Sequence, residues 1–167
     1  MDSLYPMRRF RQKLTDSECS AILESNTSGV LSLTDGSGVP YGVPMSYCWD
    51  GGRLYFHCAK EGRKLDIIRA NPLVSFCVTD MDTVVPEKFT TYFRSVIVSG
   101  RAVIASTENE ASRRAALGLF CGKYSPDIPG KEKEISNSLP RVTIIEVIPE
   151  EISGKQAIEL VRGNENK

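Results

Sequence analysis

The chain has 167 residues, the size of one domain, because domains usually contain about 100–200 residues. Its 21 Lys and Arg residues balance 21 Asp and Glu residues, so a formal net charge of +0 gives no overall attraction to nucleic acid or an anionic membrane. Hydrophobic residues make up 41% of the sequence, which excludes intrinsic disorder. We expect one globular domain over residues 1–167, with its core from about residue 8 to about residue 162 and a frayed C-terminal tail.

The five cysteines occur at positions 19, 48, 58, 77 and 121, without any C-x-x-C spacing. This odd set fits neither a disulfide framework nor a zinc site made of four thiolates, so we expect reduced thiols, most of them buried, and no bound metal. The N-terminus lacks the basic and then apolar pattern of a signal peptide, and no run approaches the roughly 18 apolar residues of a membrane helix. These features predict a cytoplasmic protein.

Helix and strand patterns alternate through the first half of the chain. The capping box from Thr15 to Glu18 predicts a helix from about residue 16 to Glu24. Strand patterns follow at residues 29–34, 39–49, 54–59 and 73–79. Pro40 and Pro44 place the second of these strands at a sheet edge or a bulge, because proline removes a ladder donor. A helix over residues 62–71, ended by Pro72, precedes the fourth strand.

The second half begins with residues 81–88, which have no clear period and are predicted to form a loop. A long β pattern covers residues 90–105, and Gly100 in its middle predicts a bulge or sharp bend. The capping box from Thr107 to Glu110 predicts a helix through Phe120. The remaining predicted elements are a loop at 124–133, a helical turn at 131–135, a strand at 141–148 that ends at Pro149, and a short helix at 156–161.

The strand patterns are joined mainly by hairpins, with few long crossovers. They predict a mainly β fold with flanking helices, in which six antiparallel strands close into a small barrel.

The tripeptide Gly62-Arg63-Lys64 is the first candidate for binding chemistry. Both cations fall in the first turn of a predicted helix, where the helix dipole is already about half a unit positive. Backbone N–H groups, the glycine and two cations together make a phosphate site. The alternative is that both side chains point into water or pair with Glu61 and Asp66.

His57 is the only histidine of the chain. A two-residue period places it on one face of its strand with Tyr55, while Leu54 and Phe56 point into the barrel. His57 is therefore expected near the barrel surface, a few residues before the phosphate site; the alternative is a hydrogen-bonded structural residue. No G-x-S-x-G motif occurs, which argues against a serine hydrolase.

Two further segments carry polar groups that a ligand could use. Ser95 shares a strand face with apolar neighbours, so its hydroxyl needs a partner in the backbone or in a ligand. In the run Val43-Pro44-Met45-Ser46, the proline interrupts the ladder and leaves backbone groups free for a bound molecule.

An ordered set of motifs resembles the flavin-binding split-barrel family typified by pyridoxamine 5′-phosphate oxidase, and within it the nitroimidazole-resistance (Nim-type) branch. The resemblance runs roughly from Arg8 to Arg162. The motifs are Gly42-Val43-Pro44-Met45-Ser46-Tyr47, Leu54-Tyr55-Phe56-His57-Cys58-Ala59, Gly62-Arg63-Lys64, Arg94-Ser95-Val96, Gly100-Arg101-Ala102, Lys123-Tyr124-Ser125-Pro126 and Ile152-Ser153-Gly154-Lys155-Gln156-Ala157.

The resemblance implies a six-stranded antiparallel split barrel that forms a homodimer, with FMN in a groove at the dimer interface. It places backbone contacts to the flavin at Val43, Pro44, Met45 and Ser46, and further cofactor contacts at Phe56, His57, Cys58 and Ala59. It also places the phosphate at Arg63 and Lys64, while Ser95 matches a position where oxidase members carry a cofactor-binding Gln. His57 is the catalytic candidate, since the Nim-type branch carries a His there and reduces nitroimidazole drugs to amines.

The sequence departs from the family at its C-terminus. It lacks the Trp and Arg constellation through which pyridoxamine 5′-phosphate oxidases hold pyridoxal phosphate, since its only Trp is Trp49. We therefore do not expect vitamin B6 chemistry. The expected function is FMN-dependent reduction of nitroaromatic or other small-molecule acceptors. The alternatives are a flavin-binding redox sensor or carrier without turnover, or a haem-binding protein with His57 as ligand; other branches of the family bind deazaflavin.

Overall fold

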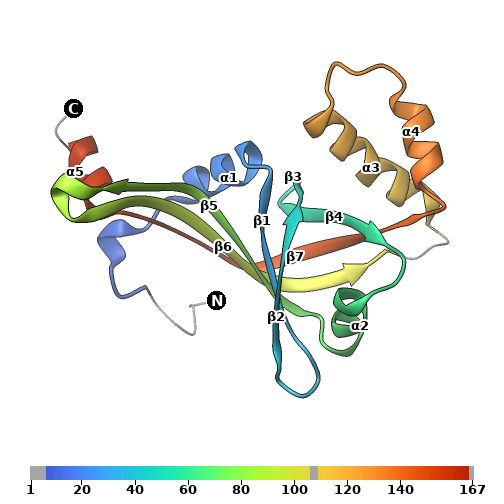
Figure 1. Ribbon diagram of the computed structural model, residues 1–167, viewed down its shortest axis with the longest axis horizontal. Helices are drawn as coiled ribbons and strands as arrows, with labels where there is room; N and C mark the ends of the chain where they lie inside the picture. Colours follow the sequence, from blue (N-terminus) through green and yellow to red (C-terminus); the bar gives the residue numbers. More distant parts are fainter. Residues whose placement is uncertain (1–6, 106–108, 166–167) are drawn as a thin grey trace.

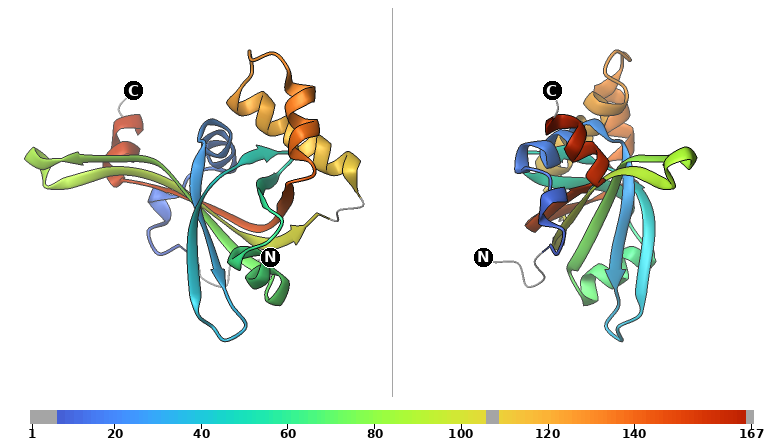
Figure 2. Two further views of the ribbon diagram at one scale, coloured as in Figure 1. Left: turned by 45° about the vertical axis from the view of Figure 1, so that its right-hand side comes forward. Right: turned by 90° about the vertical axis from the view of Figure 1, so that its left-hand side faces the viewer.

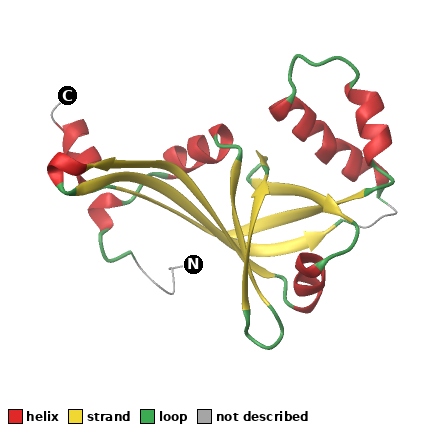
Figure 3. Cartoon of the chain, viewed as in Figure 1, coloured by secondary structure: helices red, strands yellow, loops and turns green. Residues whose placement is uncertain are grey.

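A single antiparallel sheet of seven strands, in the order β2-β1-β5-β6-β7-β4-β3, is the centre of the computed structural model, which describes residues 7–105 and 109–165 (Figure 1). The strands are β1 (Ser28–Thr34), β2 (Pro40–Ser46), β3 (Cys48–Asp50), β4 (Arg53–Ala59), β5 (Leu73–Val85), β6 (Thr90–Ile104) and β7 (Val142–Gln156). The helices are α1 (Asp16–Ser25), α2 (Arg63–Ala70), α3 (Glu110–Tyr124), α4 (Lys131–Ser138) and α5 (Ile158–Glu165), with short 3₁₀ turns η1 (Phe10–Gln12) and η2 (Pro86–Lys88). The predicted mainly β fold with flanking helices is confirmed (Figure 3). None of the described helices combines the length and apolarity needed to cross a membrane.

Local sequence signals set several element ends as predicted. The Thr15 hydroxyl accepts a hydrogen bond from the Glu18 N–H at 3.2 Å, and the Glu18 carboxylate accepts one from the Thr15 N–H at 2.7 Å, which completes the capping box of α1. The strand with the two prolines, β2, pairs only with β1 and forms one edge of the sheet. The predicted break at Gly100 is also confirmed, because the β6–β7 register shifts between Ser99 and Gly100.

The sheet has seven strands rather than six because the predicted run at residues 39–49 divides at Tyr47. The Tyr47 backbone N–H donates to the Tyr124 hydroxyl at 3.1 Å, so it serves a side chain and not a strand ladder. The Tyr47 ring is fully buried, and its hydroxyl donates to the Leu23 carbonyl at 2.8 Å. As a result, β2 and β3 are the two end strands, and no pairing between them closes the sheet within the described residues.

The sheet curls around the core although it is not closed by hydrogen bonds. The rings of Phe56 on β4 and Phe76 on β5 lie 5.0 Å apart, even though β6 and β7 separate these strands in the sheet. The Tyr47 ring packs against Phe76 at 4.9 Å. These three rings are the largest fully buried side chains and fill the centre of the core.

The prediction of a loop at residues 81–88 is wrong. Strand β5 continues to Val85, where it pairs with Thr90 of β6, and only η2 and Phe89 turn the chain. This hairpin projects from the rest of the molecule, with α5 beside it (Figures 1 and 2). Its end is exposed on both faces, with Val84 67% and Phe89 99% accessible, so the sequence there has no apolar period to reveal the strand.

The predicted end of the last strand at Pro149 is also wrong, because β7 continues to Gln156. Pro149 lies opposite Gly100, at the register shift of the β6–β7 pair. The regular pattern of backbone hydrogen bonds is interrupted there, so the strand tolerates a proline, which has no N–H. The helices near the C-terminus are longer than predicted: α3 extends to Tyr124, α4 spans more than one turn, and α5 covers Ile158–Glu165 instead of residues 156–161. The side chain of Asn109 caps α3 by accepting from the Ser112 N–H at 3.1 Å, while Thr107, the first residue of the predicted capping box, lies outside the described residues.

Helices α3 and α4 form a hairpin over one end of the sheet, with a small core of their own. This core contains Ala116, Leu117, Ile135, Leu139 and Ile144. The buried Arg113 of α3 donates to the Val142 carbonyl at 2.8 Å and also to the Leu139 carbonyl, which ties the helix pair to β7. The hairpin is thereby fixed beside β4 and β7.

Replacing Gly100 by Ala tests the close contact at the bulge. A Cβ at this position would lie 2.2 Å from the Ile148 carbonyl oxygen, which is backbone and cannot rotate away. We expect Gly100→Ala to lower the free energy of unfolding by about 1–3 kcal/mol. In contrast, a Cβ at Gly118 within α3 meets no heavy atom within 4 Å, so Gly118→Ala should raise it by about 0.5–1 kcal/mol. Urea unfolding of both variants measures the difference, and equal effects would contradict the packing argument.

Candidate functional site

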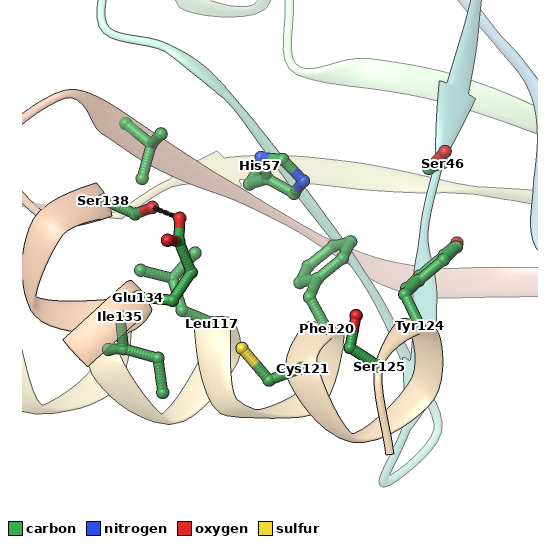
Figure 4. Close-up of a pocket in the computed structure, with 11 residues that line it drawn as sticks. Ser46, His57, Leu117, Phe120, Cys121, Tyr124, Ser125, Glu134, Ile135 and Ser138 are labelled. Atoms are coloured by element: carbon green, nitrogen blue, oxygen red, sulfur yellow. Dashed lines mark hydrogen bonds between the residues drawn. The ribbon is translucent and has the colours of Figure 1, made fainter. Parts of the chain in front are cut away.

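A cavity of about 300 Å³ lies between β4, the C-terminal half of α3 and helix α4 (Figure 4). Eleven residues from the sheet and both helices line it: Ser46, His57, Leu117, Phe120, Cys121, Tyr124, Ser125, Glu134, Ile135, Ser138 and Val142. Most of its wall is aromatic or aliphatic, with a few polar groups, which is typical of a small-molecule site.

His57 lies on the face of β4 that looks into this cavity. Leu54 and Phe56 of the same strand are fully buried in the core, so the predicted alternation of β4 is confirmed. The imidazole packs edge-on against the Phe120 ring, with 4.6 Å between centroids and an interplanar angle of 87°. Although His57 is partly open to solvent, desolvation beside the Phe120 ring lowers the pKa of the imidazole below its ordinary value.

Phe120 and Tyr124 form the aromatic wall of the cavity on α3. Their rings are nearly parallel, at 13°, with centroids 6.0 Å apart. The Tyr124 hydroxyl accepts from the Tyr47 N–H and lies 2.8 Å from the Tyr47 carbonyl oxygen and 2.5 Å from the Thr27 carbonyl oxygen. This hydroxyl therefore anchors the end of α3 to the junction between β2 and β3.

A second polar chain connects α3 to the base of the β5–β6 hairpin. The Lys123 ammonium donates to the Asn26 carbonyl at 2.5 Å and lies 4.4 Å from the centre of the Tyr47 ring. Burial lowers the pKa of Lys123. The Asn26 side chain donates to Asp80 at 2.9 Å, and Asp80 in turn accepts from Arg94 at 2.5 Å. These contacts set the position of α3 relative to the hairpin.

The two backbone segments singled out in the sequence lie on free edges of the sheet. Residues 43–46 belong to β2, which has β1 on one side and no partner strand on the other among the described residues. Residues 56–59 lie beyond the short β3, which covers only residues 53–55 of β4. Both segments therefore have backbone N–H and C=O groups that no strand uses.

The side chains of these segments are placed differently. Ser46 and His57 both line the cavity, whereas Phe56 is 0% exposed and offers a ligand only its backbone. Cys58 is half-buried and Ala59 is exposed at the end of β4.

The start of α2 follows directly from the free edge of β4. Gly62 adopts a φ of 135°, a conformation that other residues rarely adopt. The Arg63 guanidinium lies over the Tyr41 ring of β2 at 4.4 Å, and Asp66 pairs with Arg69 at 2.9 Å. Within the described residues, neither Arg63 nor Lys64 forms an ion pair with a carboxylate. Two unpaired cations at a helix N-terminus are suited to an anion.

Ser95 is the candidate that the structure leaves apart from the cavity. It is half-buried on β6, between Thr79 of β5 and Lys155 of β7, and it does not line the cavity. Conversely, Phe120, Tyr124 and Glu134 line the cavity although their sequence context does not predict a role in a site. The only signal for them was the motif Lys123-Tyr124-Ser125-Pro126, which falls at the end of α3.

The sequence model of the pyridoxamine 5′-phosphate oxidase family matches residues 15–156. The chain belongs to this family. The matched segment contains the whole sheet and helices α1 to α4, and with them the cavity, both free edges and the start of α2. No curated protein matches the sequence.

Solved structures share the fold. A candidate 5-nitroimidazole antibiotic resistance protein from Bacteroides thetaiotaomicron superimposes with a TM-score of 0.72 at 21% identity, over 86% of this chain and 86% of that chain. An FAD-binding protein from Mesorhizobium loti gives 0.65 at 25% identity, over 87% and 97% of the two chains. The flavocytochrome Anf3 from Azotobacter vinelandii gives 0.74 at 24% identity, over 94% and 74%.

The single histidine allows its titration to be followed without ambiguity. Because desolvation disfavours the charged ring, the NMR titration of the His57 Cε1–H signal should have its midpoint below the ordinary value of 6.5. As the pH falls from 6.5 through that midpoint, the unfolded state binds the proton first, so His57 should make the native state less stable there. His57→Gln should reduce this loss. A midpoint at or above 6.5 would contradict the desolvated position.

Proposed function

We propose that this protein is a flavin-dependent oxidoreductase that reduces small aromatic acceptors, with FMN as its cofactor and nitro compounds among its substrates. The observation that carries the proposal is the succession, along the chain, of the cavity residue His57, a free strand edge and a helix that begins with two unpaired cations. Membership of the family and the FAD-binding protein at 25% identity support a flavin.

The residues present fit a flavin mononucleotide by the chemistry of their donors. Arg63 and Lys64 would hold the phosphate, which carries nearly two negative charges at neutral pH. Backbone groups at residues 43–46 and 56–59 would bond the polar edge of the ring system. When bound, the flavin supplies the electrons of the reaction, and the protein orients it and supplies protons. Ser95 would belong to the same site only through a rearrangement or a second chain, because it lies on β6 between β5 and β7, away from both free edges.

We also infer that the curled sheet is the split barrel of the family, with the free edges of β2 and β4 as the split. The ring contact between Phe56 and Phe76 across two intervening strands supports the closure. The five cysteines are all free thiols, which supports a location in the reducing cytoplasm.

A homodimer completes the proposal. Uncovered strand edges are usually paired or covered in folded proteins, so a second copy of the chain would cover the free edges of β2 and β4. In sedimentation velocity, the blue absorbance band of a flavin should move with the mass of two chains. A flavin-loaded monomer would refute the dimer. A sharp Soret band without the flavin band would indicate haem and refute the flavin. Both bands together would indicate that the protein binds both groups, as the name of the flavocytochrome Anf3 implies for that protein.

The phosphate position can be tested at Lys64. Charge-assisted hydrogen bonds contribute about 1.5–3 kcal/mol, so Lys64→Ala should weaken FMN binding by roughly 10- to 150-fold. Riboflavin, which has no phosphate, should bind almost equally to both proteins. Lys60→Ala removes an exposed cation just before the helix and should leave both affinities unchanged. If FMN and riboflavin lose affinity equally, the phosphate does not bind at this helix.

Reduction of a nitro group consumes protons as well as electrons, and His57 is proposed to pass them from water to the substrate. Because desolvation lowers the pKa of His57, its imidazolium form is the minor one at pH 7, and this form is the donor that water then restores. A positioned general acid contributes about 10²–10⁴-fold, so His57→Ala should retain its flavin but lose nitro reduction by a factor in that range. The loss should be smallest at low pH, where solvent supplies protons. If His57→Ala and the unchanged protein have the same turnover per bound flavin, His57 serves only to bind the cofactor. No reduction by either protein would favour a redox sensor or carrier.

A further inference from the structure

The residues that line the cavity beside His57 carry charges that would not suit the phosphate of pyridoxamine 5′-phosphate. Among its lining residues, Glu134 of α4 is the one carboxylate, and no lysine or arginine is present. Desolvation lowers the pKa of His57 and burial raises the pKa of Tyr124, and both shifts favour the uncharged side chain. A ligand in this cavity therefore meets one negative charge and no cation among the residues that line it.

Glu134 is held in place on the helix side of the cavity. The Ser138 hydroxyl, one turn later on α4, donates to one carboxylate oxygen at 2.9 Å. Figure 4 shows this carboxylate reaching from α4 toward the side of the cavity where His57 lies. The second carboxylate oxygen has no hydrogen-bond partner among the described residues, so it can accept a hydrogen bond from a ligand.

The other walls restrict the shape of such a ligand. The parallel rings of Phe120 and Tyr124 form one side, and Leu117, Ile135 and Val142 add aliphatic surface. A flat aromatic ring suits these walls. Lys131 and Lys133 line an adjoining hollow that shares Glu134 with this cavity, and neither of them lines the cavity itself.

We propose that Glu134 determines the substrate class: planar aromatic compounds that carry a hydrogen-bond donor or a positive charge are selected, and compounds that carry a phosphate or carboxylate are rejected. This inference rests on the proposed function, because it names the acceptors of the same site. Such a site would disfavour pyridoxamine 5′-phosphate as a substrate. The phosphate group of that compound would face the Glu134 carboxylate, and no cation lines the cavity to hold it.

The test uses three probes of nearly equal shape: 4-nitrobenzylamine, 4-nitrobenzyl alcohol and 4-nitrobenzoate, which are cationic, neutral and anionic at pH 7. Calorimetric titration of the purified protein with its cofactor gives the three dissociation constants. Glu134 is exposed, so each unit of charge should change the affinity by about 2- to 5-fold, with the amine tightest and the carboxylate weakest.

Two variants assign the order to one residue. Glu134→Gln should reduce the differences among the three probes to less than about 2-fold. Glu132→Gln removes the same charge from the same helix outside the cavity, and should keep the order of the unchanged protein. Equal binding of the probes, tightest binding of the carboxylate, no binding at all, or an unchanged order in Glu134→Gln would each overturn the proposal.

The measurement does not depend on electron transfer. If the protein reduces no nitro compound but binds the probes in the expected order, the proposed reaction fails and the role of Glu134 in ligand selection stands. If reduction proceeds with no preference for charge, the reaction stands and the role of Glu134 fails.

Discussion

The backbone of Tyr47 is the point on which the arrangement of the site depends. Its N–H donates to the Tyr124 hydroxyl instead of to a neighbouring strand, which ends β2 and lets the chain turn into β3. Its buried ring packs against the central aromatic core and bonds to α1 through the Leu23 carbonyl. One residue thus separates the two end strands, secures α3 above them and fixes the wall that faces His57.

Much of the fold could be predicted because its signals are local. The capping box of α1, the prolines of β2 and Gly100 each act through a short-range steric or hydrogen-bonding effect that a sequence displays directly. The end of the β5–β6 hairpin could not be predicted, because its residues are exposed on both faces. The second half of β7 could not be predicted either, because it lies beyond a bulge. Their pairing depends on a partner strand, and an alternating pattern of apolar residues is missing.

The site was predicted in part for the same reason. The position of His57 follows from alternation within one strand, and the cations at the start of α2 follow from their place beside a glycine. The walls contributed by Phe120 and Glu134 arise only when the α3–α4 hairpin folds back over β4. In the sequence, Phe120 is one apolar residue of an amphipathic helix, and Glu134 is one of several charges on a short helix. Only a tertiary contact distinguishes them.

The free edges of the sheet matter for the folded chain before it has bound a cofactor or a partner chain. Open strand edges are templates on which another chain can extend a sheet, and aggregation begins there. Pro40 and Pro44 interrupt the row of N–H donors along β2, and the edge of β4 is only a few residues long before Gly62 turns the chain away. The same backbone can therefore stay open to a small molecule while it resists growth into a fibril.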